Sequence, residues 1–135
     1  MSEIKTYKQW MGVKAYINNS NAIRSIKDGD VWWAAVGENV GVEIDGKNSR
    51  YSRPIVILKK LNNLISIAVP LTTKEHNGTW YQKFTFQGKT QTAVLSQTRP
   101  ISTARLYTRI GRLSRGDLRN LRSAYIRLFQ DKNMP

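Results

Sequence analysis

Residues 53–60 read RPIVILKK, a compact apolar run opened by an arginine and a proline. A run of this length that is rich in β-branched residues predicts a buried strand. Pro54 has no N–H group to donate within a sheet, so it fits the start of such a strand better than its middle. Arg53 is therefore expected at the mouth of the core.

A second apolar run, residues 64–69, follows a short polar connection. A connection of this length favours an antiparallel hairpin. The start of the first strand then lies beside the end of the second, so Arg53 is predicted to lie near Thr72 and Thr73. This pairing would bring one guanidinium and two hydroxyls to one edge of the sheet.

Composition narrows the possible functions. The chain has 135 residues, which fits one domain with a single core, and its 22 Lys and Arg against 9 Asp and Glu give a net charge of +13. Such a charge indicates a polyanionic partner, above all nucleic acid. The absence of cysteine excludes disulfides and thiolate chemistry, and the single histidine, His76, argues against a histidine-rich metal site. No apolar segment reaches about 18 residues, so a cytoplasmic protein without a membrane partner is expected.

Four further segments are predicted from their patterns. Residues 3–18 have the spacing of an amphipathic helix, and residues 31–36 form a strand in which Trp32 and Trp33 face opposite sides. Residues 37–52 form a long loop with three glycines. Residues 79–86 and 91–97 are strands joined by a turn at 87–89.

The C-terminal part predicts a basic segment and a helix. Residues 106–113 carry arginines, and Ser114 with Asp117 three residues later predicts a helix start. The buried stripe of this helix is expected to be Leu118, Leu121, Tyr125 and Leu128. The arginines at other positions form a solvated face or, as an alternative, help to attract RNA or phosphate: Arg115, Arg119, Arg122 and Arg127. The fold class is therefore predicted as mainly β with helices (α+β), a small and strongly curved sheet or barrel.

Seven short motifs occur in an order that resembles the MazF/PemK (Kid) toxins of type II toxin–antitoxin systems. They are GDVWW at 29–33, GVE at 41–43, DGK at 45–47, RPIVIL at 53–58, PLT at 70–72, LSQTR at 95–99 and RLS at 112–114. The resemblance covers residues 28 to about 130. It implies a toxin domain at 28–135, preceded by an N-terminal helical extension at 1–27.

The resemblance also implies a fold and an activity. Such proteins are SH3-like barrels with a C-terminal helix, they assemble as homodimers, and they cleave single-stranded RNA at short sequences without a metal or another cofactor. The 2′-hydroxyl attacks the adjacent phosphate, which leaves 2′,3′-cyclic phosphate and 5′-hydroxyl ends. A small acidic antitoxin is the expected protein partner.

Carried onto this sequence, the resemblance assigns the reaction to Arg53 and Thr72, the same pair that the hairpin brings together, and Ser96 is added as a further donor. The residues expected to bind substrate are Trp33, Glu43, Lys47, Thr73, Lys74, Gln97 and Arg99.

Two positions depart from the family pattern. Val42 stands where some members have a histidine, and Ser96 stands where some have an acidic residue. The general base is therefore not assigned, and Glu43 is the carboxylate considered for it. Two alternatives stay open: a non-catalytic module that binds RNA or antitoxin, and a toxin that acts on a protein target such as gyrase.

Overall fold

The computed structural model describes residues 25–37 and 52–130. Within these residues the strands are β1 (Asp30–Ala35), β2 (Ser52–Lys60), β3 (Ile65–Thr72), β4 (Tyr81–Phe86), β5 (Lys89–Val94), β6 (Arg99–Ser102) and β7 (Leu106–Arg112). Two 3₁₀ helices, η1 (Leu95–Gln97) and η2 (Thr103–Arg105), and one α-helix, α2 (Arg115–Arg127), complete the described chain. The predicted N-terminal helix at 3–18 and nearly all of the predicted loop at 37–52 lie outside the described residues.

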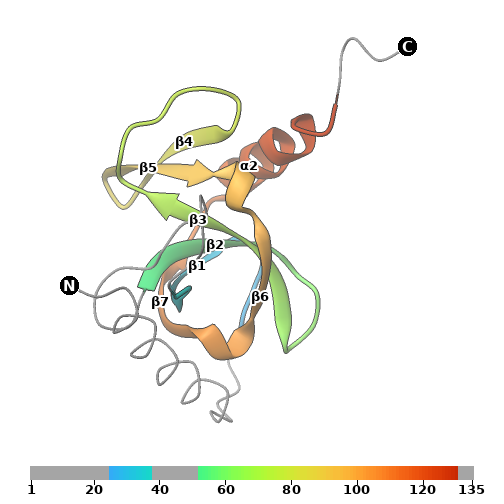
Figure 1. Ribbon diagram of the computed structural model, residues 1–135. Helices are drawn as coiled ribbons and strands as arrows, with labels where there is room; N and C mark the ends of the chain where they lie inside the picture. Colours follow the sequence, from blue (N-terminus) through green and yellow to red (C-terminus); the bar gives the residue numbers. More distant parts are fainter. Residues whose placement is uncertain (1–24, 38–51, 131–135) are drawn as a thin grey trace, which may run out of the picture.

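The strands form one antiparallel sheet that curls into an open barrel. Their order is β4-β5-β3-β2-β1-β7, and β6 pairs with β3 beside this path. Figure 1 shows β1, β2, β3, β6 and β7 arranged as a ring, with the β4–β5 hairpin and α2 on one side of it. The pairing of the described strands leaves the ring open between β6 and β7. The prediction of a small curved barrel with a C-terminal helix is confirmed.

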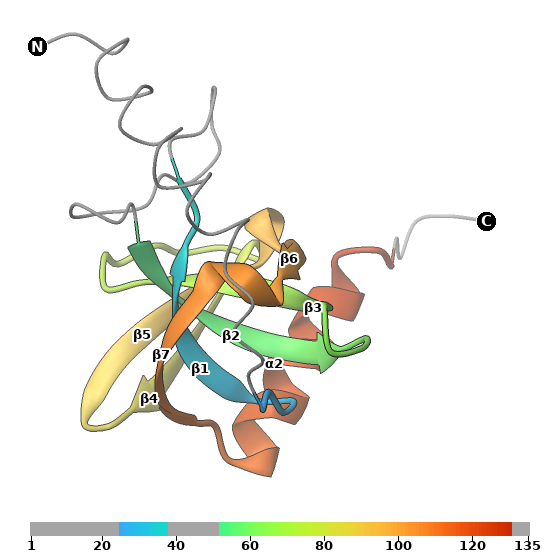
Figure 2. The ribbon, with the colours of Figure 1, turned by 90° about the horizontal axis from the view of Figure 1, so that it is seen from below.

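The barrel has apolar packing on both faces of β2, which explains why residues 55–58 are continuously apolar. Val56 and Leu58 pack with Leu121 of α2, in what we call the helix-side core. Ile55 and Ile57 point the other way and pack with Trp32 in the barrel interior. Figure 2 shows α2 outside the ring of strands, consistent with two separate apolar layers.

The hairpin of β2 and β3 is confirmed, but β3 is longer than predicted. Ile55 pairs with Pro70, and β3 continues to Leu71 and Thr72, which pair with β5. On this same side of β3, away from β2, residues 65–68 pair with β6. Pro70 therefore lies where β3 changes its partner on that side, a place where a missing N–H group costs no ladder bond.

Three other segments also differ from the prediction. The strand expected at 79–86 begins only at Tyr81, as β4. The strand expected at 91–97 is β5, which spans Lys89–Val94, and Leu95–Gln97 forms η1 instead. The basic segment at 106–113 is a strand, β7, paired with β1 along the edge of the sheet. An edge strand exposes many side chains. The arginines of β7 therefore interrupt the alternation of apolar residues by which a half-buried strand is recognised in sequence.

The predicted turn between β4 and β5 is confirmed. Gln87 and Gly88 both have positive φ, 51° and 78°, as a two-residue hairpin turn requires. The side-chain amide of Gln87 donates to the Ile110 carbonyl of β7 at 3.1 Å. A Cβ atom on Gly111 would lie 2.9 Å from the Phe86 ring, so a glycine there lets the hairpin pack against β7.

The C-terminal helix begins as predicted, because Ser114 Oγ accepts a hydrogen bond from the Asp117 amide at 3.1 Å. Leu121 is fully buried, and the rest of the predicted stripe is partly buried against the helix-side core. One arginine departs from the predicted solvated face. Arg122 donates to the Leu58 carbonyl and to Asp28, so it ties α2 to the sheet.

Candidate functional site at the mouth of the barrel

Arg53 and Thr72 lie together at one end of the barrel, which we call the mouth. Arg53 follows the first residue of β2, and the β2–β3 register, extended by two residues beyond the Ile55–Pro70 pair, places it opposite Thr72. Its Nη1 atom donates to the carbonyl of Leu71 at 3.2 Å. The structure thus places Arg53 beside the end of β3 that carries Thr72, as the predicted hairpin requires.

The hydroxyl of Thr72 is oriented by the main chain that follows it. Thr72 is buried, and its Oγ1 atom accepts a hydrogen bond from the Lys74 amide at 3.2 Å. A threonine hydroxyl has two lone pairs and one proton, so this bond still leaves the O–H group as a donor. Thr73 and Lys74 are exposed directly beyond β3, so both predicted contacts lie beside Thr72.

A small apolar cleft lies in the barrel interior, two residues along β2 and β3 from this pair. Ile55 and Pro70 line it, on the same face of the sheet as Arg53 and Thr72. Gln97 of η1 and Arg99 of β6 line its other side. Both were predicted to bind substrate, and the structure places both at this mouth.

Ser96 stands apart from Thr72 along the sheet. It is exposed in η1, four residues beyond Thr92, and Thr92 is the residue that pairs with Thr72. It neighbours Gln97 in the chain and hence the cleft, but it is not in register with Thr72.

Trp33 is not on the face that carries Arg53. It pairs with Pro54, whereas the next residue of β1, Ala34, pairs with Arg53, and successive residues of a strand face opposite sides. Trp33 is half-buried and lines a hollow with Phe86 and Lys89 on the outer face. The structure therefore separates this predicted base contact from the Arg53–Thr72 pair. Two other predicted contacts, Glu43 and Lys47, lie outside the described residues, as does Val42.

A third arginine, Arg105, reaches the mouth and was not predicted there. It closes η2, and its Nη1 atom donates to the carbonyl of Ala35 at the end of β1, 3.0 Å away. Burial lowers the pKa of the Arg105 guanidinium, and repulsion from Arg99 lowers it further. A bound anion would relieve this repulsion. The contact joins residues 70 apart in the sequence, so no local pattern could have revealed it.

The mouth thus combines guanidinium groups with an oriented hydroxyl, a set suited to binding a phosphate.

The sequence also matches a family model. The model describes PemK-like, MazF-like toxins of type II toxin–antitoxin systems, and it matches residues 27–129. The chain belongs to this family. Members of the MazF-like family are generally endoribonucleases.

Solved structures agree with the assignment at the level of the fold. A mycobacterial endoribonuclease solved in complex with its cognate antitoxin is 13% identical, with a TM-score of 0.61 over 78% of this chain and 95% of that one. The toxin MazF-mt6 of Mycobacterium tuberculosis is 16% identical, with a TM-score of 0.55 over 74% of this chain and 95% of that one. No curated protein matches the sequence. At these identities the likeness shows a shared MazF-like fold.

Two further findings describe the chain around the site. In residues 25–37 and 52–130, no group of three or more His, Asp or Glu side chains is arranged to hold a metal ion. No helix in the same ranges is long and apolar enough to cross a membrane.

Proposed function

We propose that the chain is a toxin endoribonuclease that cleaves single-stranded RNA at the mouth of the barrel. The observation that carries this proposal is the placement of Arg53 beside Thr72, within a family of endoribonucleases. The net charge of +13 supports a polyanionic substrate. Attack of the 2′-hydroxyl on the adjacent phosphate would give 2′,3′-cyclic phosphate and 5′-hydroxyl ends without a metal ion.

Arg53 stabilises the dianionic phosphorane in this proposal. Its planar guanidinium can bind two phosphate oxygens at once and stays charged through the reaction. The bond to the Leu71 carbonyl fixes the direction of the side chain. A preorganised donor of this kind contributes about 3 to 4 kcal/mol of transition-state stabilisation.

Thr72 orients the scissile phosphate. The Lys74 amide holds its oxygen, so the hydroxyl proton is directed toward an anionic ligand at the mouth. Ser96 adds a donor from η1, and Thr73, Lys74, Gln97 and Arg99 contact the flanking nucleotides.

A different group must accept the proton of the 2′-hydroxyl, because a guanidinium stays protonated in proteins and is therefore a poor base. Glu43, in the segment between β1 and β2, is the carboxylate that we propose for this role, with Lys47 of the same segment binding substrate. Sequence preference would come from unstacked bases held by aromatic rings and read along their edges.

The proposed partners follow from the charge and from the family. An acidic antitoxin fits the basic mouth and would block it, and the mycobacterial structure described above holds an endoribonuclease with its cognate antitoxin. A homodimer is the proposed assembly.

The test is cleavage of a mixed-sequence single-stranded RNA in the presence of a chelator, with both termini of every fragment mapped. We expect discrete cuts with cyclic phosphate and 5′-hydroxyl ends that are lost in Arg53→Ala. Arg115→Ala is the matched control, because it removes an exposed arginine from the start of α2. RNA that is bound but never cut would support the binding module instead, and growth arrest with intact RNA would support a protein target.

A further inference from the structure

The face of the sheet that carries Arg53 and Thr72 continues across β5 to β4. Thr72 pairs with Thr92, and Thr92 pairs with Lys83. Directly opposite residues of an antiparallel ladder place their side chains on the same face. The row that begins at Arg53 therefore ends at Lys83.

The two middle residues of the row, Thr72 and Thr92, are short and buried, whereas the residues at its ends are long cations. Neighbouring strands lie about 4.8 Å apart, so three steps separate Arg53 from Lys83 by about 14 Å of sheet. The Lys83 side chain is 40% exposed, which leaves its ammonium group within reach of a ligand.

The hairpin that carries Lys83 is anchored from its other face. Phe84 and Phe86 of β4 alternate with Lys83 and pack against the helix-side core. The Gln87 bond to Ile110 holds the turn against β7. The face that carries Lys83 therefore points away from the helix-side core, and the hairpin beneath it is held in place.

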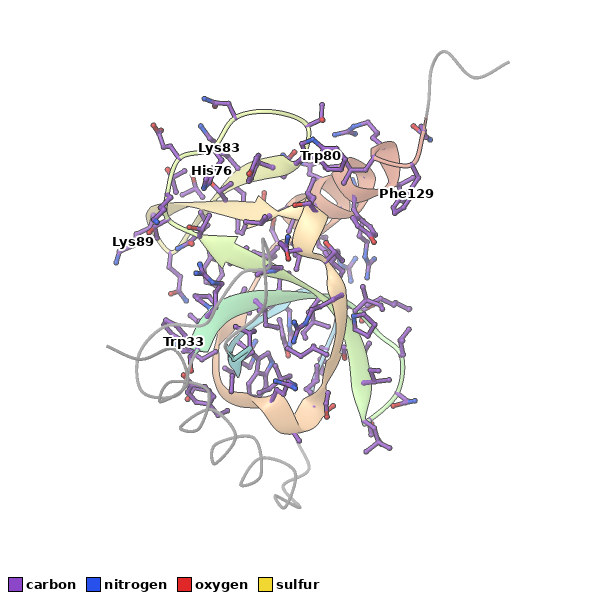
Figure 3. The ribbon with its side chains drawn as sticks, viewed as in Figure 1. Trp33, His76, Trp80, Lys83, Lys89 and Phe129 are labelled. Carbon is purple, nitrogen blue, oxygen red and sulfur yellow. The ribbon has the colours of Figure 1, made fainter. Side chains whose placement is uncertain are left out.

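An aromatic pair lies next to Lys83. Tyr81 is two residues earlier on the same face, and its ring stacks on that of His76 with centroids 4.6 Å apart and planes 9° from parallel. Lys83 Nζ donates to Asn77 Oδ1 at 3.4 Å and forms an ion pair with the exposed Glu75 carboxylate at 3.9 Å, so it borders the segment that carries His76. Figure 3 places His76 and Lys83 together over β4, away from Lys89.

We propose that His76, Tyr81 and Lys83 form a subsite for one nucleotide of the RNA, at the far end of the row from Arg53. Lys83 binds the phosphate of this nucleotide, and its base stacks on the outer face of the His76 ring. Stacked rings with a nearby cation are a general means of holding single-stranded nucleic acid. The subsite rests on the proposed function for the identity of its ligand. It adds ground-state binding, so its loss raises KM and leaves kcat unchanged.

The chain offers a matched control for the cation. Lys89 is exposed on the same hairpin, but it pairs with Phe86 and lies with Trp33 on the opposite face. The measurement is the affinity for a labelled mixed-sequence single-stranded RNA over a range of salt concentrations. Lys83→Ala is expected to reduce the slope of log affinity against log salt by about 0.7, the value for one phosphate contact on a single strand. Lys89→Ala is expected to leave the slope unchanged.

The aromatic pair is tested by removing single bases. Once the cut sequence has been mapped, an RNA with a 2′-deoxy sugar at the attacked position binds without being cleaved, and each flanking base is replaced in turn by an abasic site. One abasic position is expected to weaken binding to the natural protein by about tenfold, within the range for one stacked base. That loss should disappear in His76→Ala and return in His76→Phe, which restores a stacking ring.

The outcomes separate the subsite from the proposed function. Equal salt slopes for Lys83→Ala and Lys89→Ala, or an abasic loss that persists in His76→Ala, would overturn the subsite while RNA cleavage stands. If the protein binds RNA with the expected slopes but does not cut it, the phosphate contact of Lys83 would stand and the proposed endoribonuclease activity would be overturned. Failure to bind single-stranded RNA would overturn both.

Discussion

The two ends of β1 use arginine in different ways. At its start, Asp30 is buried and accepts hydrogen bonds from Arg109 and Arg112 of β7, from the indole of Trp32 and from the Lys27 amide. At its end, Arg105 donates to the carbonyl of Ala35. Arg53 lies across from Ala34 and also donates to a carbonyl.

The difference teaches how charge is assigned to structure or to ligand. A buried carboxylate compensates the arginines around it, so that end of the strand is a structural joint. At the mouth, a main-chain carbonyl fixes the direction of each guanidinium, as a preorganised phosphate site requires.

The sharpest test of this contrast is Arg53→Lys. The change keeps the positive charge but loses the planar fork that binds two phosphate oxygens. We expect the cleavage rate to fall nearly as far as in Arg53→Ala, by about 3 kcal/mol of transition-state free energy or roughly a hundredfold. Single-turnover cleavage measures the rate, and thermal unfolding verifies that both variants fold. A lysine variant with natural activity would mean that Arg53 supplies only charge.

The opposite end is tested by Asp30→Asn, which should act on stability instead. The neutral amide would leave Arg109 and Arg112 without their carboxylate, but both arginine side chains are 43% exposed and can be solvated. We expect a loss of about 2 to 3 kcal/mol in the free energy of unfolding, near the lower limit for breaking a buried ion pair. Urea denaturation measures it.

The control for that prediction is RNA cleavage under conditions where the variant is fully folded. Its rate should match that of the natural protein, because Asp30 lies at the other end of β1 from the mouth. A folded Asp30→Asn protein that cannot cleave RNA would show that Asp30 contributes to activity, so the two ends of β1 would not have separate roles.

Local patterns predicted the parts of this fold that depend on neighbours in sequence. The β2–β3 hairpin, the opposite orientation of Trp32 and Trp33 and the Ser114 cap all follow from short-range chemistry. The strand β7 did not, because its pairing with β1 is supported by contacts to Asp30 from arginines about 80 residues away. The position of Arg105 at the mouth could not be predicted for the same reason, because its contact with Ala35 joins distant parts of the sequence.

The candidate site shows the same division. Arg53 and Thr72 could be paired because one hairpin carries both. Trp33 was grouped with them because sequence alone does not say which face of the sheet binds a ligand, and the register places it on the other face.

The hydroxyl at the mouth is tested by Thr72→Val and Thr72→Ser. Valine keeps the volume of this buried side chain and removes the donor, so we expect cleavage to slow by about 1 to 1.5 kcal/mol, roughly five- to tenfold. Serine retains the hydroxyl and should remain close to natural activity. Cleavage rates at saturating RNA distinguish the two variants. If both lose activity equally, the methyl group and its packing matter more than the hydroxyl.

The smallest expected effect is the pH dependence of the Asp30 joint. Burial alone would raise the pKa of Asp30, but the Arg112 bond, the Lys27 and Trp32 donors and the Arg109 charge outweigh it, and the pKa is lowered. A lowered folded pKa means that the stabilisation is complete above the unfolded value of about 3.9 and is lost as pH falls through the folded value. The difference in unfolding free energy between the natural protein and Asp30→Asn should therefore stay constant from pH 7 to about pH 5 and shrink below about pH 4. The other carboxylates titrate in both proteins and cancel in this difference, so urea titrations at a series of pH values isolate Asp30. A difference that stays constant to the lowest pH would mean that the carboxylate has the same pKa folded and unfolded, and that its bonds to β7 do not select the charged form.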